Sequence, residues 1–115
     1  MDVIGKKDGL KFARKSRDFN KIHTNPIIGY NSIFGENIVH GVLPVLIFFK
    51  KIFKKNSIKF SSCKINFKNP IFYNEKIKIK VIKKKNFQEY SFIQENKICT
   101  SIKIENELEK FLEKE

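Results

Sequence analysis

Hydrophobic and polar positions along the first third of the chain predict one short helix followed by a loop. Residues 8–19 place Leu10 and Ala13 among charged positions at helical spacing, with Asp8 as the expected N-cap. Residues 20–38 show no period and contain several Asn and Gly residues. We therefore expect a long ordered loop there, of the kind that often carries function in compact domains.

A second, very apolar helix is predicted to begin close to Gly41. The segment HGVLPVLIFFKKIF is apolar on nearly all sides until Lys50. Pro44 fits only in the first turn of a helix, which places the helix start next to Gly41. A helix that is apolar all round is expected to be buried in the middle of its fold.

Alternating hydrophobic and polar positions predict about four antiparallel strands in the second half. The alternation begins in 57–67 and is clearest in 75–82, where Ile and Lys residues alternate. Two further runs, 87–94 and 97–104, flank a two-residue hairpin candidate at 95–96. One apolar helix followed by a strand meander predicts an α+β fold whose sheet curls around that helix.

The length of 115 residues is typical of a single domain. We expect that domain over 1–104, followed by an acidic tail or short helix at 105–115, where five of the twelve acidic residues lie. The longest apolar stretch, 41–49, is far short of the ~20 residues that a membrane span requires. The N-terminus lacks an apolar signal-peptide core, so a cytoplasmic protein is expected. Cys63 and Cys99 lack zinc spacing and are predicted to be small core residues.

The net charge of +12 is interpreted mainly as a compositional bias. Lys, Ile, Asn and Phe together make up 63 of the 115 residues, a bias that affects core and surface alike. Residues 1–104 hold 22 basic and 7 acidic residues, a surface that attracts the phosphates of a nucleic acid or a nucleotide-bearing cofactor. Nucleic acid is the less favoured partner, because the Lys residues alternate with Ile as on a solvated sheet face. In addition Arg, the preferred residue for phosphate forks and base edges, occurs only twice.

The densest group of titratable side chains places Asp18, Asn20 and His23 within six residues. On a continuous helix Asp18 and His23 would lie about 140° apart, so we expect the helix to end near Asp18. Asn20 is the expected exit residue, since it tolerates the left-handed conformation. A carboxylate and an imidazole brought together can hold a water and exchange protons with it. The alternative is a capped helix end followed by a surface histidine.

A second group, FGENIVHGVLP, lies at the start of the apolar helix. Gly41 would leave backbone N–H groups uncovered there, and these donors together with the helix dipole suit a developing oxyanion. The alternative is ordinary helix-start geometry. His40 beside it has no acidic or Cys/His cluster at metal spacing, so we expect no metal site.

The two groups together resemble the MaoC-like, (R)-specific enoyl-CoA hydratase family of hot-dog folds. The family motif is roughly aromatic-x-x-x-Ser-Gly-Asp-x-Asn-Pro-x-His, followed further along by Ile-x-His-Gly. The matching residues of this sequence are Phe12, Ser16, Asp18, Asn20, His23, Phe34, Gly35, Ile38, His40 and Gly41. The next family landmark, Phe-x-x-Pro-Val-x-x-Gly-Asp, is similar to residues 67–75, and the resemblance covers about residues 9–104.

The resemblance implies a single hot-dog fold, with an antiparallel sheet wrapped around one long apolar helix and the family's first strand absent or very short. It implies that Asp18 and His23 are the catalytic pair and that Asn20 supports their geometry. It also implies an oxyanion and substrate-binding role for His40 and Gly41, with the Gly41 N–H polarising a thioester carbonyl. The implied reaction adds water to, or removes it from, a trans-2-enoyl thioester of coenzyme A or acyl carrier protein. No other cofactor is implied, and a homodimer with the site near the subunit interface is expected.

Departures from the family pattern bear on activity. Arg17 replaces the usual Gly and Lys21 the usual Pro, which either alters the loop or brings a cation within reach of a substrate phosphate. Leu46 and Phe49 stand where relatives often carry smaller residues, which favours a short acyl group. The alternative function is a non-catalytic hot-dog module that binds an acyl group or a partner subunit. Arg17 and the trimmed N-terminus favour that alternative, and the retained catalytic pair counts against it.

Overall fold

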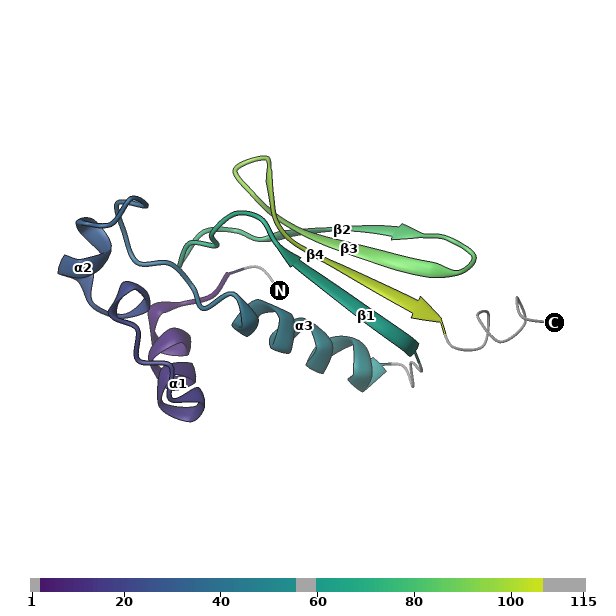
Figure 1. Cartoon of the computed structure of the whole chain (residues 1–115), viewed down its shortest axis with the longest axis horizontal. Coiled ribbons are helices and arrows are strands. Elements are labelled where there is room, and N and C mark those ends of the chain that lie inside the picture. The colour runs from purple at the N-terminus through teal and green to yellow at the C-terminus, as the bar shows by residue number, and fades with distance from the viewer. Residues whose placement is uncertain (1–2, 56–59, 107–115) are drawn as a thin grey trace. The chain divides into compact units, whose positions relative to one another are not determined.

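The computed structural model describes residues 3–55 and 60–106 (Figure 1). Its elements are α1 (Lys6–Ser16), the 3₁₀ helix η1 (Lys21–His23), α2 (Pro26–Tyr30), α3 (Val42–Lys55), β1 (Phe60–Phe67), β2 (Lys78–Lys83), β3 (Phe87–Gln94) and β4 (Lys97–Asn106). They form two compact units, which we name the N-terminal unit (Met1–Phe48 and Pro70–Ile77) and the sheet unit (Phe49–Asn69 and Lys78–Glu115). No helix within the described residues is long and apolar enough to span a membrane.

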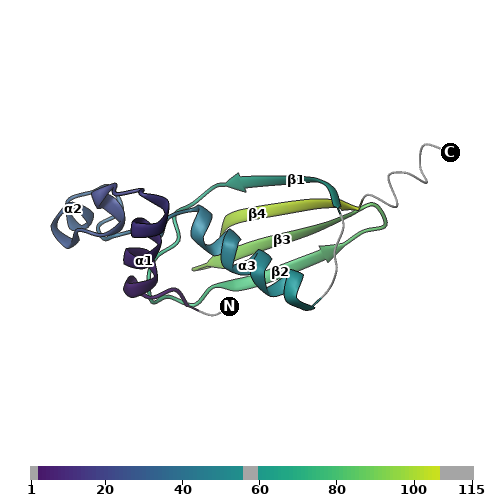
Figure 2. The same cartoon turned by 90° about the horizontal axis from the view of Figure 1, so that it is seen from below.

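The sheet unit contains one antiparallel four-stranded sheet with the strand order β1-β4-β3-β2 (Figure 2). The β3–β4 hairpin turns through Glu95 and Asn96, whose φ angles are 50° and 62°. Two successive positive φ angles are the geometry of a type I′ turn, the tight turn that matches the twist of the two strands. The four predicted strands and the hairpin are therefore confirmed, except that β2 begins at Lys78 and not at 75. The expected start of the first strand, 57–59, lies outside the described residues.

The central strands carry the most buried residues of the sheet unit. Phe92 of β3 and Ile102 of β4 are fully buried, and Cys99 is 1% exposed. Cys63 on the edge strand β1 is only half-buried, and its burial raises the pKa of its thiol. The prediction of a core cysteine is thus confirmed for Cys99 and holds only in part for Cys63. Strand β4 continues to Asn106, and the rest of the expected C-terminal tail lies outside the described residues.

Helix α1 begins earlier than predicted, because its N-cap is Gly5 and not Asp8. The Asp8 carboxylate accepts the backbone N–H of Gly5 at 3.0 Å, and the Asp8 N–H donates to the Gly5 carbonyl at 3.0 Å. Asp8 therefore acts as the acid of the first turn, where a carboxylate satisfies a backbone donor and faces the positive end of the helix dipole. The described residues that precede α1, 3–5, form no strand.

The segment 20–38, predicted as a long loop, contains two short helices capped by asparagine side chains. The Asn25 carboxamide oxygen accepts the backbone N–H groups of Ile27 and Ile28 at the start of α2. Pro26 occupies the first helical position, where its missing N–H is not needed. Helices of three and five residues are too short to show a hydrophobic period, so the pattern could not reveal them.

Helix α3 begins at Val42 with Pro44 in its first turn, as the sequence predicted. It is not buried all round, because Val42 and Leu46 are each 49% exposed and Lys50 is also exposed. These positions follow one another at intervals of four and form a single stripe of the helix. The buried positions of the same helix are Leu43, Pro44, Val45 and Phe48. The expectation of a helix buried on all sides is therefore corrected to a helix with one exposed apolar stripe.

Candidate active site

Three side-chain oxygens at alternate positions set the path of the chain after α1. The Ser16 hydroxyl oxygen accepts the backbone N–H of Asp18 at 3.2 Å, and the Asp18 carboxylate accepts that of Asn20 at 3.3 Å. The Asn20 carboxamide oxygen then accepts the N–H of Ile22 at 3.1 Å and caps η1. Each bond spans two residues, the pattern by which Ser, Asp and Asn stabilise turns. These linked turns join α1 directly to η1.

The left-handed residue at the end of α1 is Arg17, with φ 59° and ψ 21°. The prediction that Asn20 takes this conformation is wrong, because Asn20 has φ −59° and serves as the cap of η1. A left-handed conformation costs a residue with a Cβ atom about 1 kcal/mol or more, whereas Gly adopts it readily. The motif that this segment resembles has Gly at the position of Arg17, and the backbone geometry gives the physical reason.

His23 is held by its ring and by its backbone. Its Nδ1 lies 2.9 Å from the carbonyl oxygen of Ile38, which can only accept a hydrogen bond. Nδ1 must therefore carry the proton, and Nε2 keeps a lone pair available as a base. The Tyr73 hydroxyl donates to the His23 carbonyl at 3.0 Å. Burial raises the pKa of Tyr73 to about 12, with a smaller contribution from Asp8, so this donor stays protonated at neutral pH.

His40 is a buried side chain packed between the two members of the predicted pair. It is 2% exposed, and its ring stacks on that of His23 with centroids 4.0 Å apart and planes inclined by 26°. Its Nε2 donates to the backbone carbonyl of Asp18 at 3.2 Å. Its Nδ1 has no hydrogen-bond partner within the described part of the chain. Burial is the largest of the effects on its pKa, which lies below the ordinary 6.5, so His40 is neutral at neutral pH.

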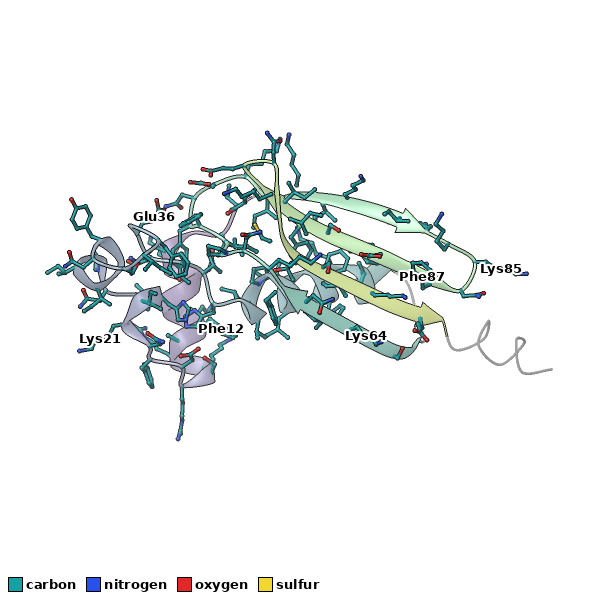
Figure 3. The ribbon with its side chains drawn as sticks, turned by 45° about the horizontal axis from the view of Figure 1, so that its top comes forward. Phe12, Lys21, Glu36, Lys64, Lys85 and Phe87 are labelled. Atoms are coloured by element: carbon teal, nitrogen blue, oxygen red, sulfur yellow. The ribbon has the colours of Figure 1, made fainter. Side chains whose placement is uncertain are left out.

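The structure brings Asp18, His23 and His40 together in the N-terminal unit. One ligand atom from each lies within 4.8 Å of the others. Hydrogen bonds to water are about 2.8 Å long, so two groups up to about 5.5 Å apart can share one water molecule. The Asp18 side chain is 50% exposed and the ring of His23 is partly exposed, so solvent has access to both. The ring centroids of Phe12 and His40 are 5.0 Å apart in an edge-to-face arrangement. Figure 3 shows Lys21 pointing away into solvent.

An Asp with two His residues is also a possible set of metal ligands. A metal must lie near the plane of each imidazole, at about 2.1 Å from the ligating nitrogen. The ring centroids of His23 and His40 are 4.0 Å apart and the ring planes are inclined by only 26°, so the rings are stacked and their planes are closer to parallel than to converging on one metal ion. Because Nε2 of His40 already donates to Asp18, the arrangement suits a hydrogen-bonded water better than a metal ion.

Gly41 lies directly between His40 and the first turn of α3 and is exposed. The backbone N–H of Leu43 is already bonded to the His40 carbonyl at 3.0 Å. The N–H groups at a helix start otherwise lack intrahelical acceptors and attract negative charge. The start of α3 therefore follows directly after the stacked His40, and the oxyanion role of Gly41 stays a prediction.

Sequence reasoning missed Asn37, which is 7% exposed and ties the site segment together. Its amide group donates to the carbonyls of Ile22 and Asn25, each at 2.8 Å, and its oxygen accepts from the Lys6 ammonium. No sequence pattern pointed to Asn37. In the structure Gly29 packs closely against it, because a Cβ atom at Gly29 would lie 2.5 Å from the backbone nitrogen of Asn37.

Two tyrosines of the N-terminal unit differ in their surroundings. Tyr73 is buried and also anchors His23, a role that its sequence position does not reveal. Tyr30 is 76% exposed.

The chain is similar to one known protein family and to solved structures with the same fold. The model of the MaoC like domain family matches residues 2–106. A search of the curated proteins gave no match. Among solved structures, an R-hydratase from Pseudomonas aeruginosa has a TM-score of 0.68 at 22% identity, over 90% of this chain and 73% of that one.

Two further structures have the same arrangement. An (R)-hydratase from A. caviae involved in PHA biosynthesis has a TM-score of 0.70 at 19% identity, over 89% of this chain and 86% of that one. The HtdX protein of Mycobacterium tuberculosis has a TM-score of 0.76 at 17% identity, over 92% of this chain and 46% of that one. At such identities the likeness establishes the fold, and it confirms the predicted α+β hot-dog class.

Proposed function

Because this chain belongs to the MaoC-like domain family, we propose that it is a hydratase or dehydratase that acts on a trans-2-enoyl thioester. One observation carries the proposal. The Nδ1 proton of His23 is engaged by the Ile38 carbonyl, which leaves the Nε2 lone pair free of that bond, and a ring nitrogen of His23 lies within 4.8 Å of the half-exposed carboxylate of Asp18. A base and a carboxylate that can share one water are the groups that hydration of a double bond requires.

The proposed reaction uses one water held between Asp18 and His23. As the water oxygen bonds to the β-carbon of the enoyl group, the pair takes one of its protons. A proton passes from the pair to the α-carbon, so one water supplies both the hydroxyl and the hydrogen. The pair ends in its starting protonation state, and the dehydration runs through the same steps in reverse. The backbone N–H at Gly41 would donate to the thioester carbonyl, where negative charge develops.

We assign positioning roles to the two remaining site residues. Asn20 caps η1 and thereby orients the short helix that carries His23. His40 contacts both members of the pair, through the ring stack with His23 and the hydrogen bond to the Asp18 carbonyl. Because it is buried and neutral, it holds the pair together without adding a positive charge beside the base.

We also propose a homodimer with the site near the subunit interface. The exposed apolar stripe of α3, which contains Val42 and Leu46, lies directly after Gly41. The segment from α2 onward adds Ile27, Tyr30 and Ile33, which are 71%, 76% and 94% exposed. Large exposed apolar side chains gathered in one segment are typical of an interaction surface.

The test is hydration of crotonyl-CoA, followed by the loss of enoyl-thioester absorbance. Asp18→Asn and His23→Ala should each reduce kcat at least ~100-fold, the lower end of what one acid–base group supplies. Glu36→Gln is the matched control, since it removes an exposed carboxylate from the same unit, and it should retain wild-type activity. Unaltered activity in both site variants would refute the proposal. An inactive, folded wild-type protein that binds the thioester would favour a non-catalytic acyl-binding module instead.

A further inference from the structure

The chain contains only two arginines, and both lie at the C-terminal end of α1. Lysine occurs 22 times, so the compositional bias of this protein strongly favours Lys over Arg. Arg14 lies in the last turn of α1 and Arg17 is its C-cap. Arg17 follows Ser16, the last residue of α1, so both arginines lie at the same end of the helix and within four residues of Asp18 in the chain.

The conformation of Arg17 makes its presence costly. Its φ of 59° lies in the left-handed region, which disfavours every residue with a Cβ atom. Glycine would adopt this conformation without strain, and lysine would supply the same charge in keeping with the bias of the chain. An arginine in this strained conformation, in a chain so rich in lysine, therefore points to a role for the guanidinium group itself.

Neither arginine has a structural partner that would explain it. Both side chains are exposed, and within the described residues neither forms an ion pair or a side-chain hydrogen bond. A cation at the C-terminus of a helix does interact favourably with the helix dipole. Lys15 already supplies such a cation in the same turn, however, and any lysine serves this purpose equally well.

We propose that Arg14 and Arg17 bind a phosphate group of the carrier to which the enoyl thioester is attached. The inference rests on the proposed function, since it assigns the carrier-binding part of that same site. A guanidinium binds phosphate through two parallel N–H···O hydrogen bonds, a geometry that lysine cannot reproduce. Coenzyme A and the phosphopantetheine arm of acyl carrier protein both carry phosphate, separated from the thioester by the pantetheine chain. Arg14 and Arg17 lie four residues and one residue before Asp18 in the chain, at the end of α1, which suits a group held away from the reacting carbon.

The first experiment measures the binding of coenzyme A by calorimetry, so it does not depend on catalysis. Arg14→Gln and Arg17→Gly should each weaken coenzyme A binding about tenfold, the effect of losing one charge-assisted contact. Lys15→Gln is the matched control, because it removes the same charge from the same turn, and it should change the affinity less than about twofold. Arg17→Gly should not lower the Tm, since glycine relieves the left-handed strain. Weakened binding therefore cannot be attributed to unfolding.

The second experiment compares crotonyl-CoA with crotonyl-pantetheine, which lacks phosphate. In both arginine variants the rise in KM for crotonyl-CoA should exceed the rise for crotonyl-pantetheine about tenfold. A larger effect with crotonyl-acyl carrier protein than with crotonyl-CoA would identify the carrier protein as the source of the phosphate.

Equal effects on the two small thioesters, or a Lys15→Gln effect as large as the arginine effects, would overturn the inference. Wild-type turnover of crotonyl-pantetheine tests the proposed function separately, because this substrate has no phosphate to bind.

Discussion

Gly9→Ala should destabilise the protein, although helix propensity alone predicts the opposite. Gly9 lies inside α1, where replacing glycine by alanine normally stabilises a helix by about 1 kcal/mol. A Cβ atom at Gly9, however, would lie 2.0 Å from the hydroxyl oxygen of Tyr73 and 2.7 Å from the ring carbon that bears it. Tyr73 is buried, so its ring must shift and lose the hydrogen bond to the His23 carbonyl.

The net effect follows from three contributions. Overpacking of a buried ring costs about 1–3 kcal/mol, and the lost hydrogen bond costs about 1 kcal/mol. The gain in helix propensity offsets about 1 kcal/mol of this, which leaves Gly9→Ala less stable by about 1–3 kcal/mol. Because the lost bond anchors His23, the rate of hydration should fall as well.

Urea unfolding of wild type and variant measures the change in the free energy of unfolding. Lys11→Ala is the control for helix propensity, since Lys11 is exposed on the same helix, and it should change stability by less than about 0.5 kcal/mol. In a Tyr73→Ala background the clash is removed, so Gly9→Ala should become neutral or stabilising. A Gly9→Ala protein as stable as wild type would refute the assigned contact between α1 and Tyr73.

Two further predictions concern the residues that hold the proposed catalytic pair. Asn20→Ala removes the cap of η1, so it should cost about 1 kcal/mol of stability and lower kcat. Asn20→Asp keeps the capping oxygen and should restore most of the stability and of kcat. Equal losses in the two variants would contradict the capping role. The folded-state pKa of His40 lies below its unfolded value of 6.5, so its contribution to stability is present above about pH 6.5 and is lost as the pH falls through the lower folded-state pKa. The free energy of unfolding should therefore decline between pH 7.5 and 5, by at most ~1.4 kcal/mol per pH unit for one group. His40→Gln should flatten this decline, and an unchanged slope would contradict the assignment to His40.

Local patterns predicted the regular elements well. Two runs flanking a two-residue turn candidate placed β3 and β4 correctly, because a tight turn between two apolar runs is a local signal of a hairpin. Pro44 predicted the start of α3 within one residue, since proline is excluded from every later turn. The same patterns missed η1 and α2, whose stability comes from the side-chain caps Asn20 and Asn25 and not from an apolar face.

The position of the left-handed residue was a local question that the sequence alone could not decide. Asn20 has the better intrinsic preference, and Arg17 takes the conformation because α1 makes its last turn at Ser16. The helix end in turn depends on the hydrogen bonds that link Ser16, Asp18 and Asn20. Propensity ranks single residues, whereas the conformation that forms is the one that satisfies all the linked turns together.

The sequence alone identified the candidate side chains, their order along the chain and the family to which the chain belongs. Their mutual arrangement came from the tertiary structure: Nδ1 of His23 faces the Ile38 carbonyl, His40 stacks on the His23 ring, and Tyr73 holds the His23 carbonyl from 50 residues away. The reason is physical. The spacing of residue types encodes the burial and turns of one segment, whereas hydrogen bonds between distant segments exist only after the chain has closed on itself.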